Sequence, residues 1–239
     1  MSFKNTTEIL NILDEIKNLP KVPCSRCGRV YRGEAVNFVC TDCKEKEIQE
    51  IEEKKRKNQQ IQTLLNLSNI PKRYKTAIFQ PKTETQNRVS KYLIENFKIL
   101  DQSTDILMFG AIGTGKTYLS CAFAMELICR RQVRIKYITE YDLLSLYFEK
   151  RYQEFQNFKK SEILILDEIG KRVLVDWQRI QLEELLSYRY SEILPTIYIT
   201  NLEQEGFREF LGDRLADRLR ENRVKRFAFE GESLRGGIS

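Results

Sequence analysis

From about residue 70 onward, two patterns of hydrophobic and polar positions alternate along the chain. Short apolar runs are followed by longer stretches in which apolar residues recur every three or four positions, the period of an amphipathic helix. Alternating strands and helices of this kind are typical of an α/β protein with a parallel sheet. We predict strands at 105–109, 133–138, 162–166 and 195–199, and helices that include 116–130, 140–149 and 177–192.

Two further helical patterns precede this region. Over residues 7–19, apolar side chains recur at helical spacing, Asn5 and Glu8 resemble a capping box, and Pro20 ends the segment. That helix either packs on its own small domain or stays exposed to bind a partner. Residues 44 to 62 are dense in Lys, Glu and Gln, which predicts a solvated connecting helix.

The change of pattern also indicates a domain boundary. The basic run 54–57 lies within the connecting helix, where it either forms part of a solvated face or contacts nucleic acid. We place the boundary between residues 63 and 70. Residues 1–66 then form an N-terminal unit with its linker helix, and residues 67–239 form the α/β domain.

Four cysteines stand in two CxxC pairs in the N-terminal unit. Cys24 and Cys27 are separated from Cys40 and Cys43 by 12 residues, and each CxxC turn supplies two adjacent corners of a zinc tetrahedron. Two disulfides, or thiols without a ligand, are the alternatives. Four thiolates leave zinc no open position, so we predict a structural site whose metal contributes most of the folding energy of this small segment. The residues between the pairs are expected to form a short hairpin, Val30–Tyr31 against Asn37–Val39.

Composition narrows the chemistry further. The 239 residues are 41% hydrophobic and 31% charged, which is typical of a globular protein. The net charge of +6 is compatible with a nucleic-acid partner but does not require one. No apolar run approaches the roughly 20 residues of a membrane span, and a signal-peptide pattern is absent, so we expect a cytoplasmic protein with reduced cysteines. Histidine is absent, so catalysis must rely on carboxylates, Lys, Arg and bound metal.

A phosphate-binding motif follows the first predicted strand. The run GAIGTGKT matches GxxxxGK[ST] between a strand and a helix, the context that this motif requires. Backbone N–H groups of the loop wrap the phosphates, Lys116 reaches the β- and γ-phosphates, and the Thr117 hydroxyl holds Mg²⁺. The predicted nucleotide-binding residues are Gly110, Ala111, Ile112, Gly113, Thr114, Gly115, Lys116 and Thr117.

Polar residues follow two of the other predicted strands. The apolar run ILIL ends in Asp167 and Glu168, which belong at the active edge of the sheet. Asp167 suits the Mg²⁺ shell, and Glu168 suits polarising the attacking water. Asn201 follows the strand PTIYIT, where it either senses the γ-phosphate or forms a turn.

Two other patterns have more than one interpretation when the residues alone are considered. Arg214 and Arg218 would share one face of a helix, which by itself describes a solvated surface. Aromatic and basic residues alternate over residues 147–160, which suits either stacking on single-stranded DNA or an amphipathic helix that buries its aromatics.

The order of these motifs resembles that of a known family. The P-loop, ILILDEIG, LPTIYITN, GDRLADRL and ESLRG, together with IPKRYKTAIF at the start, resemble the AAA+ ATPases of the bacterial DnaC/DnaI helicase-loader group, to which the transposition ATPase IstB is related. The resemblance covers about residues 68–239. It implies that Asn201 is sensor 1, Arg235 is sensor 2, and Arg218, accompanied by Arg214, is the arginine finger for a neighbouring subunit.

The same resemblance implies a function. It indicates an ATPase that self-associates through sites completed in trans by Arg218, and that loads a hexameric DnaB-type replicative helicase onto single-stranded DNA with ATP, Mg²⁺ and Zn²⁺ as cofactors. The four-cysteine unit resembles the helicase-binding domain of a DnaI-type loader. Two alternatives stay open: an IstB-like transposition ATPase acting on duplex DNA, and a nucleotide-gated adaptor of the helicase that does not hydrolyse ATP.

Overall fold

The computed structural model describes residues 18–32, 38–95, 104–218 and 224–234 of the chain. The chain divides into two compact units, Met1–Gln59 and Gln60–Ser239, which we call the cysteine unit and the sheet unit. The helix predicted over residues 7–19 lies almost entirely outside the described residues. Among the helices that are described, we find none with the length and apolar character to cross a membrane.

The cysteine unit contains a two-stranded antiparallel sheet. β1 (Lys21–Pro23) pairs with β2 (Val30–Arg32), so that Val22 lies opposite Tyr31. The predicted hairpin partner of β2 was wrong, because Phe38 and Val39 are not in a strand. The first CxxC turn instead reverses the chain between β1 and β2, with the N–H of Gly28 donating to the carbonyl of Cys24 at 2.9 Å.

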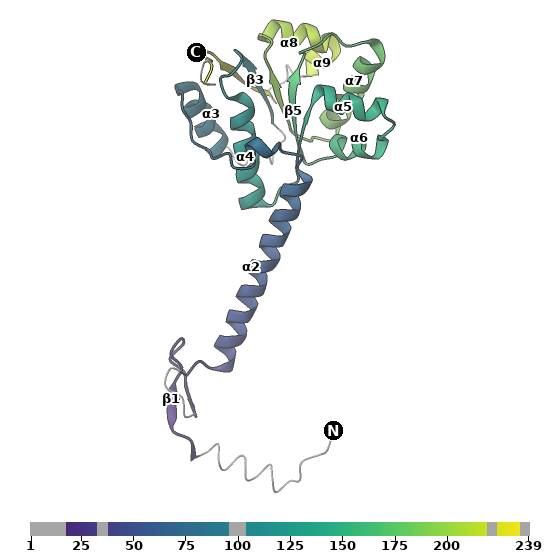
Figure 1. Cartoon of the computed structure of the whole chain (residues 1–239). Helices are drawn as coiled ribbons and strands as arrows, with labels where there is room; N and C mark the ends of the chain where they lie inside the picture. The colour runs from purple at the N-terminus through teal and green to yellow at the C-terminus, as the bar shows by residue number, and fades with distance from the viewer. Residues whose placement is uncertain (1–17, 33–37, 96–103, 219–223, 235–239) are drawn as a thin grey trace. The chain divides into compact units, whose positions relative to one another are not determined.

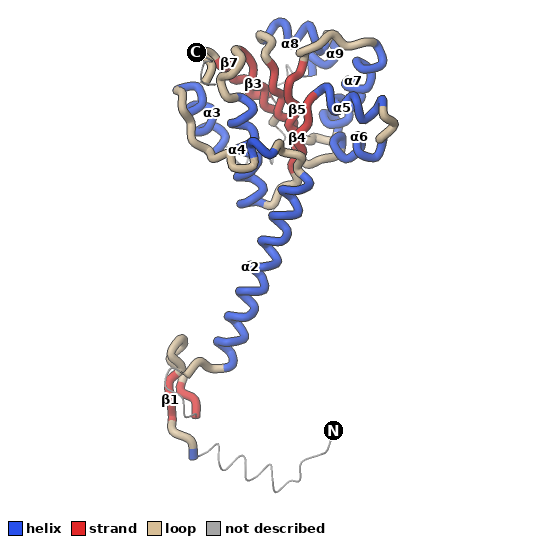
Figure 2. The backbone as a smooth tube through the Cα atoms, viewed as in Figure 1, coloured by secondary structure: helices blue, strands red, loops and turns tan. Residues whose placement is uncertain are grey.

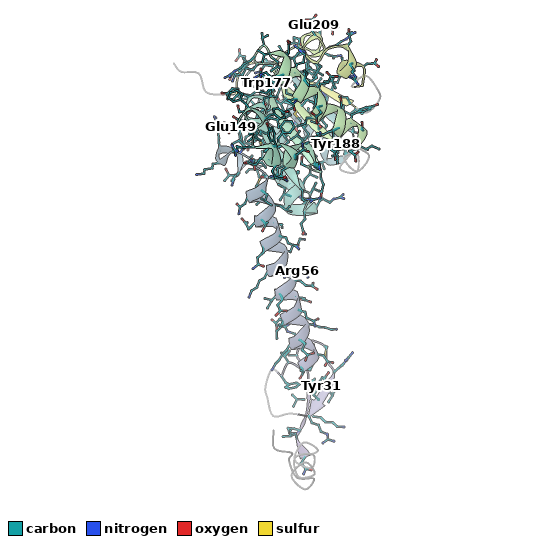
Figure 3. The ribbon with its side chains drawn as sticks, turned by 90° about the vertical axis from the view of Figure 1, so that its right-hand side faces the viewer. Tyr31, Arg56, Glu149, Trp177, Tyr188 and Glu209 are labelled. Carbon is teal, nitrogen blue, oxygen red and sulfur yellow. The ribbon has the colours of Figure 1, made fainter. Side chains whose placement is uncertain are left out.

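A long helix, α2 (Thr41–Leu67), begins directly after Cys40, contains Cys43, and crosses the division between the units. It extends the predicted connecting helix at both ends. Its basic run 54–57 is exposed, and Arg56 projects away from the helix axis (Figure 3). Ile61, Leu64 and Leu65 near its C-terminal end pack on the core of the sheet unit.

The sheet unit is built on five parallel strands in the order β4-β5-β6-β3-β7. Their bounds are β3 (Asp105–Gly110), β4 (Ile135–Thr139), β5 (Ile163–Ile169), β6 (Thr196–Thr200) and β7 (Val224–Phe229). The four predicted strands are confirmed. β7 was not predicted, because Lys225 and Arg226 interrupt the apolar pattern of this edge strand.

Helices connect the strands and cover both faces of the sheet (Figure 1). The predicted helices correspond to α4 (Lys116–Arg131), α5 (Glu140–Phe148) and α7 (Asp176–Ser191) and agree within one residue at each end. The remaining elements are η1 (Lys72–Tyr74), α3 (Glu84–Glu95), α6 (Tyr152–Lys159), α8 (Gln204–Leu211) and α9 (Asp213–Arg218).

Alternate residues of each strand enter different apolar cores, as the two-residue period of a strand requires. On one face, Ile106 and Met108 of β3 pack with α3 and α4. On the other face, Leu107 and Phe109 pack with α5, α6, α7, α8 and α9. Because all five strands run in the same direction, the segments that follow their C-terminal ends meet at one edge of the sheet (Figure 2).

Candidate functional site

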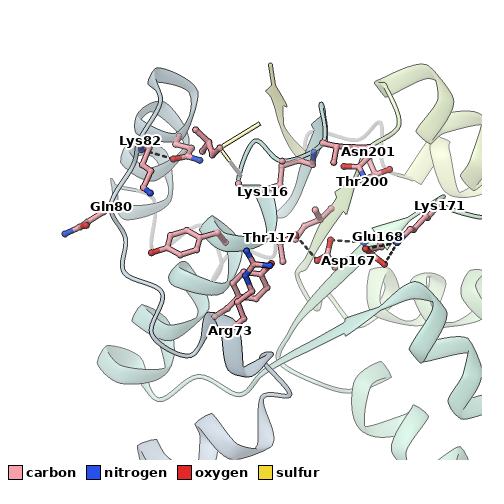
Figure 4. Close-up of a pocket in the computed structure, with 18 residues that line it drawn as sticks. Arg73, Gln80, Lys82, Lys116, Thr117, Asp167, Glu168, Lys171, Thr200 and Asn201 are labelled. Carbon is pink, nitrogen blue, oxygen red and sulfur yellow. Dashed lines mark hydrogen bonds and ion pairs between the residues drawn. The ribbon is translucent and has the colours of Figure 1, made fainter. Parts of the chain in front are cut away.

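A cavity of about 490 Å³ lies at that edge and contains most of the predicted catalytic and binding side chains (Figure 4). Three segments supply these side chains: the P-loop, which follows β3, the two acids at the end of β5, and Asn201, which follows β6. The residues that line it are Arg73, Tyr74, Gln80, Lys82, Gln86, Ile112, Gly113, Gly115, Lys116, Thr117, Tyr118, Asp167, Glu168, Lys171, Ile199, Thr200, Asn201 and Leu234.

The P-loop follows β3 and runs directly into α4. Gly110 has a φ of +106°, and a Cβ placed there would lie 2.6 Å from the carbonyl oxygen of Phe229 on β7, so only glycine fits. The Lys116 ammonium donates to the carbonyls of Gly110 at 2.8 Å and Ala111 at 2.7 Å. Burial lowers the pKa of Lys116 to about 8, and a bound phosphate would favour the charged form.

Asp167 and Thr117 are brought together although they are 50 positions apart in the sequence. The Thr117 hydroxyl donates to Oδ2 of Asp167 at 2.9 Å, and the Tyr137 hydroxyl donates to the same oxygen at 2.7 Å. The N–H of Glu168 donates to Oδ1 at 2.7 Å. Burial raises the pKa of Asp167, and these three donors oppose that shift. A hydroxyl beside a carboxylate is a donor set that fits Mg²⁺.

Glu168 lies at the rim of the same cavity, with its side chain 45% exposed. Its two carboxylate oxygens contact the ammonium of Lys171 at 3.0 and 3.1 Å. Asn201 is exposed and also lines the cavity. The preceding Thr200 is buried, and its hydroxyl donates to the carbonyl of Ile169 at 2.7 Å, which joins the ends of β5 and β6. This places Asn201 beside the two acids, as its predicted role requires.

The C-terminal motif ESLRG reaches the P-loop. The N–H of Leu234 donates to the carbonyl of Gly113 at 3.0 Å, and a Cβ on Gly113 would lie 2.1 Å from the hydroxyl of Ser233. Leu234 lines the cavity. Arg235 itself lies outside the described residues, so its predicted role as sensor 2 stays a prediction.

The two late arginines lie on α9, away from the P-loop. Arg214 donates to Oε1 of Glu183 at 3.2 Å, has a 75% exposed side chain and does not line the cavity. Arg218 is the last residue of α9, and its side chain lies outside the described part of the chain. A role for Arg218 in a neighbouring subunit therefore stays a prediction.

Several cavity residues were not predicted, because they come from segments with no phosphate or metal motif. Gln86 of α3 is buried, and its Nε2 donates to the carbonyl of Thr114 at 2.8 Å. The N–H of Ile78 donates to the hydroxyl of Tyr118 at 3.1 Å. The segment IPKRYKTAIF, which carries Arg73 and Tyr74, was the one available signal in the sequence.

The four cysteines of the cysteine unit also lie together. Their sulfur atoms are all within 4.8 Å of one another, and those of Cys27 and Cys40 are 3.8 Å apart. A tetrahedral zinc with Zn–S bonds of about 2.3 Å places its sulfurs about 3.8 Å apart. The cluster therefore fits a zinc site.

Hydrogen bonds from the backbone lower the pKa of a thiol in this cluster, whereas close contact between the sulfurs raises it. The N–H of Cys40 donates to the sulfur of Cys24 at 3.4 Å, and backbone donors, first that of Cys40, lower the pKa of Cys24 to about 6. Contact with Cys40 raises the pKa of Cys43 to about 12. A dication lets all four thiols ionise together, which this arrangement by itself disfavours.

The aromatic and basic stretch 147–160 divides into two groups. Phe155 and Phe158 are buried in the core. The charged Lys159 is also buried and contacts Glu184 at 2.6 Å. The amphipathic-helix interpretation is therefore right for this half.

The other half forms a surface cluster with a residue from a distant helix. Phe148 is 76% exposed and stacks on Trp177 of α7 at a centroid distance of 6.1 Å. Tyr147 contacts both Trp177 and Tyr152. We call these four residues the aromatic cluster; Trp177 marks its position in Figure 3.

Comparisons with known proteins point to an ATP-binding family. A family model described as IstB-like ATP binding protein matches residues 33–235. The replicative helicase loader DnaC of Escherichia coli strain K12 is 26% identical over 137 residues, covering 54% of this chain and 56% of that protein. A protein of the insertion sequence IS5376 from Geobacillus stearothermophilus is 31% identical over 183 residues, covering 71% of this chain and 70% of that protein.

Solved structures share the fold of the sheet unit. The crystal structure of the DnaC helicase loader superposes with a TM-score of 0.59 and 25% identity, covering 67% of this chain and 100% of that chain. The crystal structure of DnaI gives a TM-score of 0.59 at 19% identity, covering 71% of this chain and 98% of that chain. The parallel-sheet P-loop fold is thus shared with both.

Proposed function

Because the chain belongs to the IstB-like ATP binding protein family, we propose that it is an AAA+ ATPase that loads a hexameric DnaB-type replicative helicase onto single-stranded DNA. The observation that carries this proposal is the assembled nucleotide site, in which Lys116, Thr117, Asp167 and Glu168 line one cavity. The DnaC relatives and the four-cysteine cluster support the choice of a helicase loader.

ATP hydrolysis requires each of these residues in a separate role. Backbone N–H groups of the P-loop and Lys116 bind the β- and γ-phosphates. Thr117 and Asp167 would hold Mg²⁺, which would supply positive charge against the charge that develops on the phosphate oxygens. Glu168 orients the attacking water and accepts its proton. Asn201 and Arg235 contact the γ-phosphate.

Turnover depends on assembly in this proposal. Arg218 enters the nucleotide site of the neighbouring subunit, where its guanidinium stabilises the transition state. Support comes from the position of α9, which places Arg214 away from the nucleotide cavity of its own chain. The chain therefore hydrolyses ATP fully only as an oligomer.

The remaining parts bind the other partners. We assign residues 1–66 to helicase binding, held by zinc on the four cysteines, and residues 67–239 to the ATPase domain. The exposed side chains of the aromatic cluster support stacking of single-stranded DNA, with the exposed Lys150 beside them for phosphate contact. Arg151 is paired with Glu149 and Glu154. Reduced thiols in the zinc cluster agree with a cytoplasmic location.

A second candidate function rests on the insertion-sequence relative, which is 31% identical over 71% of this chain. An ATPase of that kind would assemble on duplex DNA and direct a transposase. We prefer the helicase loader because the DnaC relatives and the four-cysteine cluster support it. An adaptor that binds ATP without hydrolysing it is disfavoured by Glu168 in the cavity.

One experiment tests the assignment directly. The mass of the full chain is measured with its cognate replicative helicase, ATP and single-stranded DNA, and Lys116→Ala serves as the matched control. We expect a complex that contains the helicase hexamer and several copies of this chain, and that is weakened by Lys116→Ala. Assembly on duplex DNA without any helicase complex would instead support the insertion-sequence candidate.

A further inference from the structure

The carboxylate of Glu168 is already engaged inside the chain. Lys171 lies three residues later, and its ammonium contacts both carboxylate oxygens, at 3.0 and 3.1 Å (Figure 4). Both residues line the nucleotide cavity. Within the described part of the chain, these two oxygens are the contacts that the ammonium makes, so the pair does not serve a larger ion-pair network.

The backbone around Glu168 is shaped to bring these two side chains together. Glu168 has a φ of +56°, which is uncommon for a residue with a Cβ, and the pairing of β5 with β6 shifts register between Leu166 and Ile169. Gly170 follows with a φ of +73°. Backbone strain of this kind persists where surrounding structure holds it, and it concentrates at functional positions.

Two contacts hold this turn from outside. The buried Glu140, the first residue of α5, accepts the N–H of Gly170 at 2.8 Å. A Cβ on Gly170 would lie 2.4 Å from a methyl group of Leu202, so the turn also fits closely against the segment after β6. The backbone of the turn that carries Glu168 and Lys171 is therefore held by the fold.

A carboxylate with both oxygens on an ammonium is poorly placed to accept a proton from water. We propose that Lys171 is a positioning residue that holds Glu168 in a resting pose and lowers ATP turnover in the absence of partners. This inference rests on the proposed ATPase function. The side chains are 58% and 45% exposed, so water and salt weaken the pair, and it slows the reaction without blocking it.

Substitution of Lys171 in the full-length chain tests the proposal. Lys171→Met keeps the length of the side chain and removes the charge, so we expect unstimulated phosphate release to rise about two- to fivefold, the range that an exposed ion pair supports. Lys171→Arg keeps the pair and should stay near the wild-type rate. ATP affinity and thermal stability should be unchanged in both variants.

Two further measurements separate positioning from a general structural effect. The ratio of the Lys171→Met rate to the wild-type rate should fall toward one as salt is raised, because salt screens the pair only in the wild type. The double variant Glu168→Gln/Lys171→Met should not show the increased rate of phosphate release, because Lys171→Met raises that rate through Glu168.

The outcomes distinguish this inference from the proposed function. A Lys171→Met rate equal to or below that of the wild type, a loss of ATP affinity, or a gain that survives Glu168→Gln would overturn the role of Lys171. An absence of turnover in the wild type, even with helicase and single-stranded DNA, would overturn the ATPase proposal itself.

Discussion

The cysteine unit and the sheet unit hold their functional side chains by different physical means. In the described part of the cysteine unit, the only buried apolar side chains are Cys24 and Cys40. The sheet unit instead has apolar clusters on both faces of its sheet. A packed core distributes stability over many weak contacts, whereas a four-thiolate site concentrates it in one metal. Loss of one ligand should therefore unfold the first unit, while single changes in the second should affect one step at a time.

The largest expected effect is the loss of the cysteine unit when the zinc that we propose for it is removed. Metal binding at such sites contributes on the order of 10 kcal/mol of folding free energy, which a segment without an apolar core cannot replace. Cys40→Ser, or a strong chelator, should make residues 18–59 sensitive to protease while nucleotide binding by the sheet unit persists. The measurements are zinc content, limited proteolysis and binding of a fluorescent ADP analogue.

The matched control for this experiment is Cys129→Ser, because Cys129 is an exposed cysteine on α4 outside the cluster. It should change neither zinc content nor proteolysis. Protease resistance of the cysteine unit without metal would contradict the comparison between the units, and so would loss of nucleotide binding on chelation.

The second prediction separates two roles in the nucleotide site: nucleotide binding by Lys116 of the same chain, and catalysis by Arg218 of a neighbouring subunit. Lys116→Ala should lower nucleotide affinity by at least about 100-fold, because Lys116 faces the phosphates. Arg218→Ala should leave affinity within about twofold and lower turnover by at least about 100-fold, because an arginine finger acts on the transition state. Isothermal titration gives the affinities and steady-state phosphate release gives the rates.

Mixing the two variants sharpens this test. Neither should turn over alone, but mixed oligomers should recover part of the activity, because an intact site can form between a Lys116→Ala subunit that supplies Arg218 and an Arg218→Ala subunit that supplies Lys116. Equal loss of nucleotide affinity in the two single variants would place Arg218 at its own nucleotide and contradict the role in trans.

The same contrast explains what could be predicted from the sequence. The four-cysteine cluster depends on local CxxC spacing, and the P-loop depends on the glycines of its motif. Both can therefore be recognised directly in the sequence. Asp167 was predicted from the apolar strand before it. Tyr137, Gln86 and Lys171 were missed, because Tyr137 and Gln86 reach the site by packing of distant elements and Lys171 by a positive φ at Glu168.

The fold was predicted to a similar extent. Buried strands and the helices between them carry strong periodic patterns, so their existence and approximate bounds were evident. The edge strand β7 and the helix α3 were not, because the adjacent Lys225 and Arg226 interrupt the apolar run of β7 and α3 mixes polar residues into its buried face. The contact of Trp177 with Phe148 joins two helices and left no sequence signal.

The third prediction concerns a buried cation of the sheet unit. Arg189 is 1% exposed, and its guanidinium donates to carbonyls of Lys159, Ser161 and Pro195 and to the hydroxyl of Thr196. It thus connects the end of α6 with the starts of β5 and β6. Arg189→Met would remove this donor from the buried carbonyls of Lys159 and Ser161, while the carbonyl of Pro195 keeps the N–H of Leu164 at 3.3 Å. The expected cost is about 3 kcal/mol in the free energy of unfolding.

Urea unfolding of the full chain measures this change. The matched control is Arg179→Met, because the exposed Arg179 donates to a single carbonyl, that of Phe210, at 2.8 Å, and its loss should cost less than about 1 kcal/mol. A similar cost for both variants would mean that the apolar core alone holds the sheet unit.

The smallest expected effect is a pH dependence that comes from one buried carboxyl group of the sheet unit. Glu140 is 4% exposed, and burial raises its pKa from 4.5 to about 6, opposed by the N–H of Gly170 and by Arg172. A pKa raised on folding means that the folded state binds the proton more tightly. The resulting stabilisation is fully present below pH 4.5 and is lost as the pH rises through about 6.

Glu140→Gln tests this directly, because glutamine keeps a carbonyl oxygen for the N–H of Gly170 and does not titrate. From pH 7 to pH 5, the free energy of unfolding of the wild type should rise by about 1 kcal/mol relative to the variant, at 1.36 kcal/mol per pKa unit. Asp142→Asn, at an exposed position of the same helix, should follow the wild type. Parallel pH profiles for the wild type and Glu140→Gln would mean that Glu140 is hydrated, and that the turn carrying Glu168 is held by packing against Leu202 alone.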